Sequence, residues 1–367
     1  MNKRNGAIDF WKFVFSVIII IFHGKNFATG NNALFPLGAL AVEFFFIVSG
    51  VYFARSIENA RLANANVANL NSVSLGKQSF SYVWNRIKGF CPNYYIAFII
   101  SFCIANVATN AGLKKIVGRL FFSIGDLLFI TEGGMKMYNV NGVAWYLGSM
   151  VLVMLLLYPI IVKKKDMWYY VWAPLIVAVS LGILYQKYGH LRTPDAWMGL
   201  VLKGTFRAFT EITLGTIIYK VGTHFYQRIH FKLFPRVLLT IMEFMSYGVV
   251  IYHMTHGTKV MNDFVCLFAL AFAVLLSYSE QTFSKNIFGF KVFNWLGTFS
   301  FSMYLGHDAL CHRISDFFPK LSYKNRMFVY LGISCATALF IHFFSILLRW
   351  VWKKKGQRIK ALFIVEK

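Results

Sequence analysis

Long apolar runs alternate with short polar segments along the whole chain, and each run is about 20 residues, enough to cross a bilayer as a helix. One set of predicted spans lies near residues 8–24, 34–54, 91–109, 143–162 and 168–186. A second set lies near 198–219, 236–254, 262–279, 292–311 and 326–350. The pattern predicts an all-α, polytopic transmembrane helix bundle of about ten spans, forming a single domain over residues 1–367.

Two segments depart from this alternation. Residues 115–131 are apolar but contain Arg119 and Asp126 in an amphipathic pattern, so we expect an interfacial or re-entrant helix there. Residues 56–90 are polar and rich in Asn, Ala and Ser, which predicts a long cytoplasmic loop.

Composition and charge agree with a membrane protein. The chain is 57% hydrophobic and 14% charged, too apolar for a soluble domain. Its net charge of +24 comes from Lys and Arg in short segments between the apolar runs, so it indicates no nucleic-acid partner. Most of these cations fall in segments that are cytoplasmic if the N-terminus is inside, which predicts cytoplasmic N- and C-termini and a basic cytoplasmic tail over 351–367.

Cysteines and the first apolar run add two expectations. The five cysteines show no metal-ligand spacing, so we expect no metal site and no redox chemistry. The first apolar run contains Lys12 and is followed by no small-residue cleavage site, so we expect a retained helix and not a cleaved signal peptide.

One face of the first predicted helix carries four polar side chains. Asp9, Lys12, Ser16 and His23 are spaced by three, four and seven residues, which puts them on one side of a helix. Lys12 would lie near the cytoplasmic side and His23 about 16 Å away, near the outer side, at about 1.5 Å per residue. Ionisable groups within a span are functional candidates because lipid penalises them. On spacing alone, Asp9 and Lys12 could equally pair with each other, and His23 could be an interfacial histidine without a chemical role.

The second predicted span begins with Glu43, which needs a partner such as Lys12 or a histidine. Further along it, Ser49 and Gly50 form a small pair that allows close helix approach.

Two later spans also carry polar groups. Lys203, Arg207 and Glu211 follow one another at i,i+4 steps, either as a self-neutralising structural ladder or as the wall of an acceptor cavity. Tyr304 and His307 lie near the outer end of the ninth span, so two histidines on different helices are predicted at the same membrane face.

The opening segment IDFWKFVFSVIIIIFHG resembles the first-helix motif of the acyltransferase 3 family of membrane acyltransferases. That motif has an acidic residue, a basic residue and, eleven positions on, a histidine; Asp9, Lys12 and His23 occupy these places. Four later blocks resemble the family in order: FFFIVSGVYF after Glu43, YVWNRIKGFCPNYY with Arg86 and Pro92, AWYLGSMVLVMLLLYP with Trp145, and LGTFSFSMYLGH with Tyr304 and His307. The resemblance runs from residue 8 to about residue 310.

Three features differ from the family pattern. Lys12 stands where arginine is usual, and Gly89 stands where a second arginine is common, so that Lys88 would take its place. Lysine keeps the charge of arginine but loses its bidentate fork. We also expect no extracellular hydrolase-like domain of the kind that some members carry.

The resemblance implies an O-acyltransferase that moves an acyl group, most commonly acetyl, from acyl-CoA to a hydroxyl of a cell-surface or lipid-linked polysaccharide. Acyl-CoA would be a co-substrate, with no bound cofactor, and the protein would lie in the bacterial inner or plasma membrane. His23 would act as general base or, as a variant, form a transient acyl-histidine.

The other residues receive supporting roles under this hypothesis. Asp9 and Glu43 are predicted to belong to the catalytic group with His23, where Asp9 would pair with Lys12 and Glu43 would orient polar neighbours. The predicted donor-binding residues are Lys12, Arg86 and Lys88. The predicted acceptor-binding or supporting residues are Ser49, Trp145, Lys203, Arg207, Glu211, Tyr304 and His307.

A transporter or flippase of a lipid-linked saccharide is the main alternative, because basic residues in a bundle suit an anionic substrate equally well. Transporters tend to contain paired repeats with helices broken by Gly or Pro. The chain shows no convincing pair of this kind and has only 7 prolines. A structural membrane scaffold is a third alternative, against which the ionisable groups within spans argue.

Overall fold

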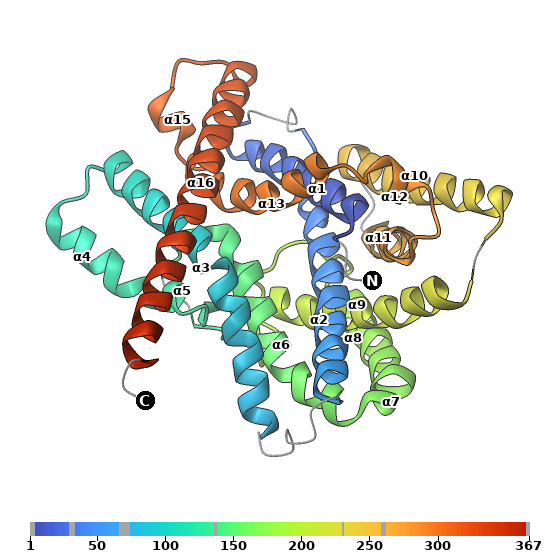
Figure 1. The fold of residues 1–367 in the computed structure, drawn as a ribbon. Coiled ribbons are helices and arrows are strands. Elements are labelled where there is room, and N and C mark those ends of the chain that lie inside the picture. The colour runs from blue at the N-terminus through green and yellow to red at the C-terminus, as the bar shows by residue number, and fades with distance from the viewer. Residues whose placement is uncertain are drawn as a thin grey trace.

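The structure is a computed structural model that describes residues 4–28, 34–65, 74–135, 138–229, 231–257 and 262–364, with side chains described except at 63–65 and 355–364. Within these ranges the chain is helical and contains no strand, which confirms the all-α fold class (Figure 1).

Eight helical segments are long and apolar enough to cross a membrane, so the chain is a multi-pass membrane protein. They are formed by α1 (Gly6–His23), α2 (Ala41–Ala65), α3 (Leu75–Ala108), α6 (Trp145–Lys163), α7 (Lys165–Met167) with η6 (Trp168–Trp172) and α8 (Ala173–Tyr188), α10 (Leu233–His256), α11 (Asn262–Ser279) and α16 (Tyr323–Ile364). The two remaining predicted spans are the charged helix α9 (Lys203–Arg228) and the 16-residue helix α13 (Lys291–Gly306). The count of ten spans and the sidedness of the termini therefore stay predictions.

The prediction of a loop over 56–90 is wrong in its extent. Helix α2 continues to Ala65 and α3 begins at Leu75, with the Ser74 hydroxyl accepting a 3.4 Å hydrogen bond from the Lys77 N–H at its start. The residues here include Ala, Glu and Arg, which are good helix formers, so both helices extend past their apolar portions. Helix α16 likewise continues to Ile364 through the basic segment predicted as a tail.

The segment 115–131 forms the short helices α4 (Leu113–Phe122) and α5 (Ile124–Leu127). Helix α4 has no buried residue, and most of its apolar side chains, among them Val117 and Phe121, are exposed. Arg119 donates hydrogen bonds to the carbonyl of Ala105 at 3.2 Å and to Asn106 Oδ1 at 2.9 Å, both near the end of α3. An amphipathic helix fastened to a span end fits the expected interfacial helix.

Two close helix pairs build the centre of the bundle: α1 lies beside α13, and α2 lies beside α9 (Figure 1). Gly50 and Gly215 make the second approach possible. A Cβ at Gly50 would lie 2.1 Å from the Ile212 carbonyl oxygen, and one at Gly215 would lie 2.2 Å from that of Ile47. The close packing predicted for the Ser49-Gly50 pair is therefore confirmed.

The remaining short helices are connectors. They are η1 (Gly24–Phe27), η2 (Gly38–Leu40), η4 (Thr131–Gly133), η5 (Gly142–Ala144), α12 (Ser284–Ile287), α14 (Asp308–Cys311) and α15 (Ile314–Phe317). Helix α14 follows α13 directly after His307, which fixes that histidine at a helix junction.

Candidate active site

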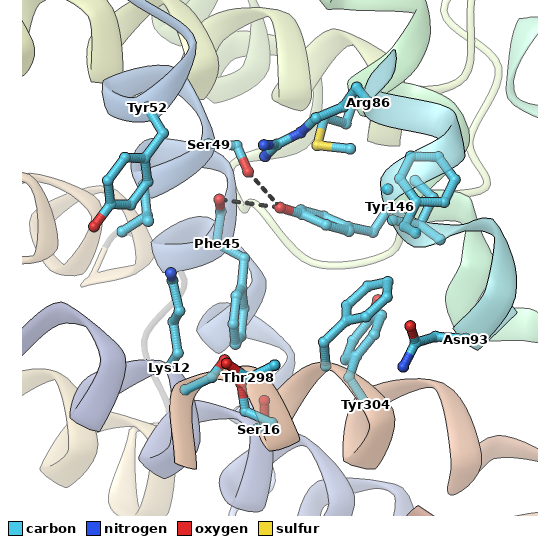
Figure 2. A pocket seen from close by; sticks show the side chains of 18 of the residues that line it. Lys12, Ser16, Phe45, Ser49, Tyr52, Arg86, Asn93, Tyr146, Thr298 and Tyr304 are labelled. Carbon is cyan, nitrogen blue, oxygen red and sulfur yellow. Dashed lines mark hydrogen bonds between the residues drawn. The ribbon is translucent and has the colours of Figure 1, made fainter. Parts of the chain in front are cut away.

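A cavity of about 620 Å³ lies between α1, α2, α3, α6, α13 and α16 (Figure 2). Lys12 and Ser16 reach it from α1, Arg86 from α3, and Tyr304 from α13. Its size falls within the range of small-molecule sites, about 300–1,000 Å³. Five of the residues singled out in the sequence therefore line one space: Lys12, Ser16, Ser49, Arg86 and Tyr304.

The charge around this cavity is positive. Arg4, Lys12, Arg86 and Arg349 all contribute to its wall, and none of the described residues that line it is acidic. Asp9 lies behind the wall, where it pairs with Arg4 and with Lys12 at 3.1 Å. The pairing of Asp9 with Lys12 agrees with the sequence, yet one carboxylate offsets only one of the four charges. The cavity therefore suits an anionic group.

Hydroxyl and amide groups line the space between these cations. Ser49 Oγ lies 2.6 Å from the Tyr146 hydroxyl, which donates a 3.1 Å hydrogen bond to the Phe45 carbonyl (Figure 2). The buried Ser16 Oγ has no hydrogen-bond partner in the described part of the chain. Tyr304 donates a 2.7 Å hydrogen bond to the Val143 carbonyl, which fixes its ring at the cavity wall.

His23 and His307 lie in contact with each other, next to the Tyr304 ring. Nε2 of His307 lies 3.2 Å from Nδ1 of His23, and the ring centroids of His307 and Tyr304 lie 6.1 Å apart. Neither histidine is part of the cavity wall. The sequence placed both histidines at one membrane face, and the structure brings them into direct contact.

The tautomers of the two histidines are assigned from their backbone contacts. Nδ1 of His23 is 2.9 Å from the Ile19 carbonyl oxygen, and Nδ1 of His307 is 3.3 Å from that of Met303. A carbonyl oxygen only accepts, so we assign the hydrogen of each neutral ring to Nδ1. His307 Nε2 then presents its lone pair to the His23 Nδ1–H, and His23 Nε2 keeps a free lone pair. His23 is thus arranged as a base whose opposite nitrogen has an acceptor.

A comparison with protein families finds a match: the acyltransferase 3 family model, described as an acyltransferase domain, matches residues 5–350. The chain belongs to this family. No curated protein and no solved structure matches the chain. The matched range includes the histidine pair and, apart from Arg4, all the residues that line the basic cavity, so an O-acyltransferase type of enzyme in a membrane is supported.

Several residues predicted for the acyltransferase site lie away from the cavity. The prediction that Glu43 pairs with Lys12 or with a histidine is wrong. Glu43 instead forms a buried ion pair with Arg207, because the close approach of α2 to α9 brings the two side chains together. Arg207 Nε also lies 3.6 Å from Glu211 Oε1, and its guanidinium carbon lies 5.7 Å from the Trp145 ring centroid.

Two predicted lysines also lie elsewhere. Lys203 Nζ donates a 2.6 Å hydrogen bond to the Arg192 carbonyl, apart from the cavity. Lys88 is exposed, with its ammonium 5.5 Å from the Trp84 ring centroid. Neither residue lines the cavity, and their predicted roles stay untested.

Sequence reasoning missed Arg4, Tyr52, Asn93 and Arg349, all of which line the cavity. Arg349 lies beyond the last block that resembles the family, so only its position in an apolar span could have singled it out.

Two carboxyl groups outside the candidate spans are strongly perturbed. Burial, reinforced by the negative charge of Asp195, raises the pKa of Glu132 to about 8. Burial raises the pKa of Asp126 to about 6, against the opposing effect of hydrogen bonds from the N–H groups of Val140 and Asn141. Neither carboxyl lines the cavity, and both were absent from the predicted site.

One group of side chains in the described part of the chain has the spacing of a metal site. Ligand atoms of Asp308, Cys311 and His312 lie within 4.8 Å of one another. Asp308 Oδ2 already accepts a 2.7 Å hydrogen bond from the Gly142 N–H, and His312 is exposed. The expectation that the protein holds no metal is not tested.

Proposed function

We propose that this acyltransferase moves an acyl group from acyl-CoA to a hydroxyl of a carbohydrate, with His23 as the general base. The observation that carries the proposal is the juxtaposition of a cavity lined by four cations with a histidine whose Nε2 is free. Acyl-CoA is a polyanion, and Arg and Lys are the side chains that bind phosphate. Acyl transfer requires a bound donor and a base. The cationic cavity would bind the donor, and His23 would be the base.

The donor would enter the cavity that Arg4, Lys12, Arg86 and Arg349 line. Its phosphates would contact these cations, and its thioester would point along α1 past Ser16 toward Tyr304. Ser16 and His23 are about 10 Å apart along α1 at about 1.5 Å per residue, a distance that the pantetheine arm can cover.

The reaction follows from the assigned protons. His23 Nε2 would take the proton of the acceptor hydroxyl while the hydroxyl oxygen attacks the thioester carbonyl. The carbon–sulfur bond then breaks, the ester forms, and the CoA thiolate takes the proton from the imidazolium. His307 would stabilise the transient charge by accepting the His23 Nδ1–H. An acyl-histidine formed at Nε2 is the variant of this route.

The remaining parts of the proposal come from the family resemblance. The acyl group would be acetyl, the acceptor a cell-surface or lipid-linked polysaccharide, and the membrane a bacterial inner or plasma membrane. Mass spectrometry of the cell-surface glycan with and without the gene tests the acceptor, since the acyl mass should disappear with the gene.

The catalytic assignment is tested with purified protein and acyl-CoA labelled in the acyl group. His23→Ala should reduce labelling of the glycan by about 100-fold or more. His256 is exposed, and His256→Ala should leave the labelling unchanged. A His23→Ala protein that is folded and active would overturn the assignment. Labelling in detergent, without separate compartments, also distinguishes an acyltransferase from a transporter or flippase.

A further inference from the structure

Three aromatic rings in the cavity wall pack against one another (Figure 2). Phe45 lies near the start of α2, Tyr146 near the start of α6, and Tyr304 near the end of α13. The ring centroid of Phe45 lies 6.2 Å from that of Tyr304 and 6.3 Å from that of Tyr146, and the two tyrosine centroids are 6.0 Å apart. These separations fall within the range of aromatic rings in contact, about 4.5–7 Å, so the three rings form a closed triangle.

The triangle lies beside the histidine pair. The Tyr304 ring lines the cavity, and its centroid is 6.1 Å from that of His307, which contacts His23 at the end of α1. The start of α2 lies at the same end of α1, because a Cβ at Gly38, just before α2, would lie 2.6 Å from the Cβ of Phe22. An acyl group directed past Tyr304 toward His23, as proposed above, would therefore meet these rings.

The three rings differ in how they are held. The Tyr304 hydroxyl is bonded to the Val143 carbonyl, and the Tyr146 hydroxyl is bonded to the Phe45 carbonyl and contacts Ser49. Tyr146 and Tyr304 are 8% and 6% exposed, whereas Phe45 is only half-buried. The Phe45 ring carries no polar atom that could fix it. It is therefore the ring of the triangle that moves aside at the lowest cost.

We propose that Phe45 limits the acyl group to a short chain, of about the size of acetyl, by filling the space beside Tyr146 and Tyr304. This role rests on the proposed function, since it concerns the acyl group of the same donor. A thioester that approaches His23 would displace the Phe45 ring, and each added methylene would need a larger displacement in a closely packed wall. A single methylene in an apolar pocket changes kcat/KM by about 10–200-fold.

A competition assay tests this role. Purified protein is given equimolar acetyl-CoA and butyryl-CoA with cell-surface glycan from a strain that lacks the gene, and mass spectrometry gives the ratio of acetyl to butyryl on the glycan. The wild-type protein should favour acetyl by about 100-fold or more, because each of the two added methylenes costs about tenfold or more. Phe45→Ala should reduce this preference about tenfold or more. Phe45→Leu should reduce it less, because leucine still fills part of the space.

The ratio is internal to each reaction, so it does not depend on how much of a variant folds. Phe45→Leu also keeps the test valid if Phe45→Ala is not produced. Phe301→Ala is the matched control, since Phe301 lines the same cavity and is half-buried like Phe45. Among the described residues, no ring contact joins Phe301 to the triangle. Its replacement should leave the ratio of the two acyl groups unchanged, whatever its effect on the total.

Three outcomes would overturn the role of Phe45. The wild-type protein could transfer both acyl groups equally well, an active Phe45→Ala protein could keep the wild-type ratio, or Phe301→Ala could shift the ratio as far as Phe45→Ala. Each of these leaves the proposed acyl transfer intact. If the wild-type protein transfers neither acyl group, the proposed function itself is contradicted, and the role of Phe45 falls with it.

Discussion

The guanidinium of Arg349 in α16 donates a 2.7 Å hydrogen bond to Oδ1 of Asn93 in α3, 256 residues earlier in the chain. Nδ2 of Asn93 in turn donates a 2.9 Å hydrogen bond to Ser302 Oγ in α13. Three helices are thus joined at the wall of the cavity. The last long helix is therefore part of the site and not only a membrane anchor.

Arg349→Ala should raise the KM for acyl-CoA about tenfold with a smaller effect on kcat, because it removes one of four cations and the anchor of Asn93. Steady-state kinetics with purified protein measure this. Lys324→Ala, which removes an exposed cation at the other end of α16, is the control and should leave KM unchanged. An unaltered KM in Arg349→Ala would remove Arg349 from the donor site.

The contrast between Arg349 and the first helix shows what the sequence could predict. Lys12 and His23 repeat at helical spacing on one local segment, so their shared face could be derived from position alone. The contact of Arg349 with Asn93 depends on how distant helices pack, which no local pattern encodes. Glu43 illustrates the same limit, since its need for a counterion was predictable but the identity of Arg207 was not.

His307 positions His23, and its replacement should affect turnover more than donor binding. His307→Leu should lower kcat by about 10–100-fold, because the Nδ1–H of His23 keeps only the Ile19 carbonyl as an acceptor and the imidazolium loses the stabilisation that His307 gives it. His307→Gln offers a carbonyl oxygen as a replacement acceptor and should retain more activity. The pH profile of kcat should also move in His307→Leu. Equal activity of the two variants would mean that His307 has no such role.

The buried pair of Glu43 with Arg207 should matter for stability. Arg207→Met leaves two carboxylates, Glu43 and Glu211, without a counterion and should destabilise the fold by about 3–5 kcal/mol. Glu43→Gln in the same protein should recover part of the loss. Thermal unfolding in detergent measures both effects. Glu43→Gln alone should lower Tm measurably while leaving kcat nearly unchanged. A variant with unchanged Tm and no turnover would instead favour the catalytic role predicted from the sequence.

Glu132 should make stability depend on pH. Its pKa is raised by burial to about 8 from an ordinary value near 4.5, so the folded state retains a proton that the unfolded state releases. The stabilisation is complete below pH 4.5, declines as the pH rises, and is lost above about pH 8. Glu132→Gln, which cannot ionise, should flatten this decline in Tm between pH 5 and 8. An identical decline in the variant would assign it to other groups.

Gly89 allows a test that adds function. It lines the cavity, a Cβ built there meets no atom within 4 Å, and an arginine is common at this place in the acyltransferase 3 pattern. Gly89→Arg should therefore fold normally and lower the KM for acyl-CoA, since it restores a bidentate phosphate ligand beside Arg86. Gly89→Glu should raise KM by charge repulsion, and Gly89→Ala separates the helix-propensity effect, about 1 kcal/mol, from the charge effect. If the arginine and glutamate variants show the same KM, the anionic part of the donor does not bind at this wall of the cavity.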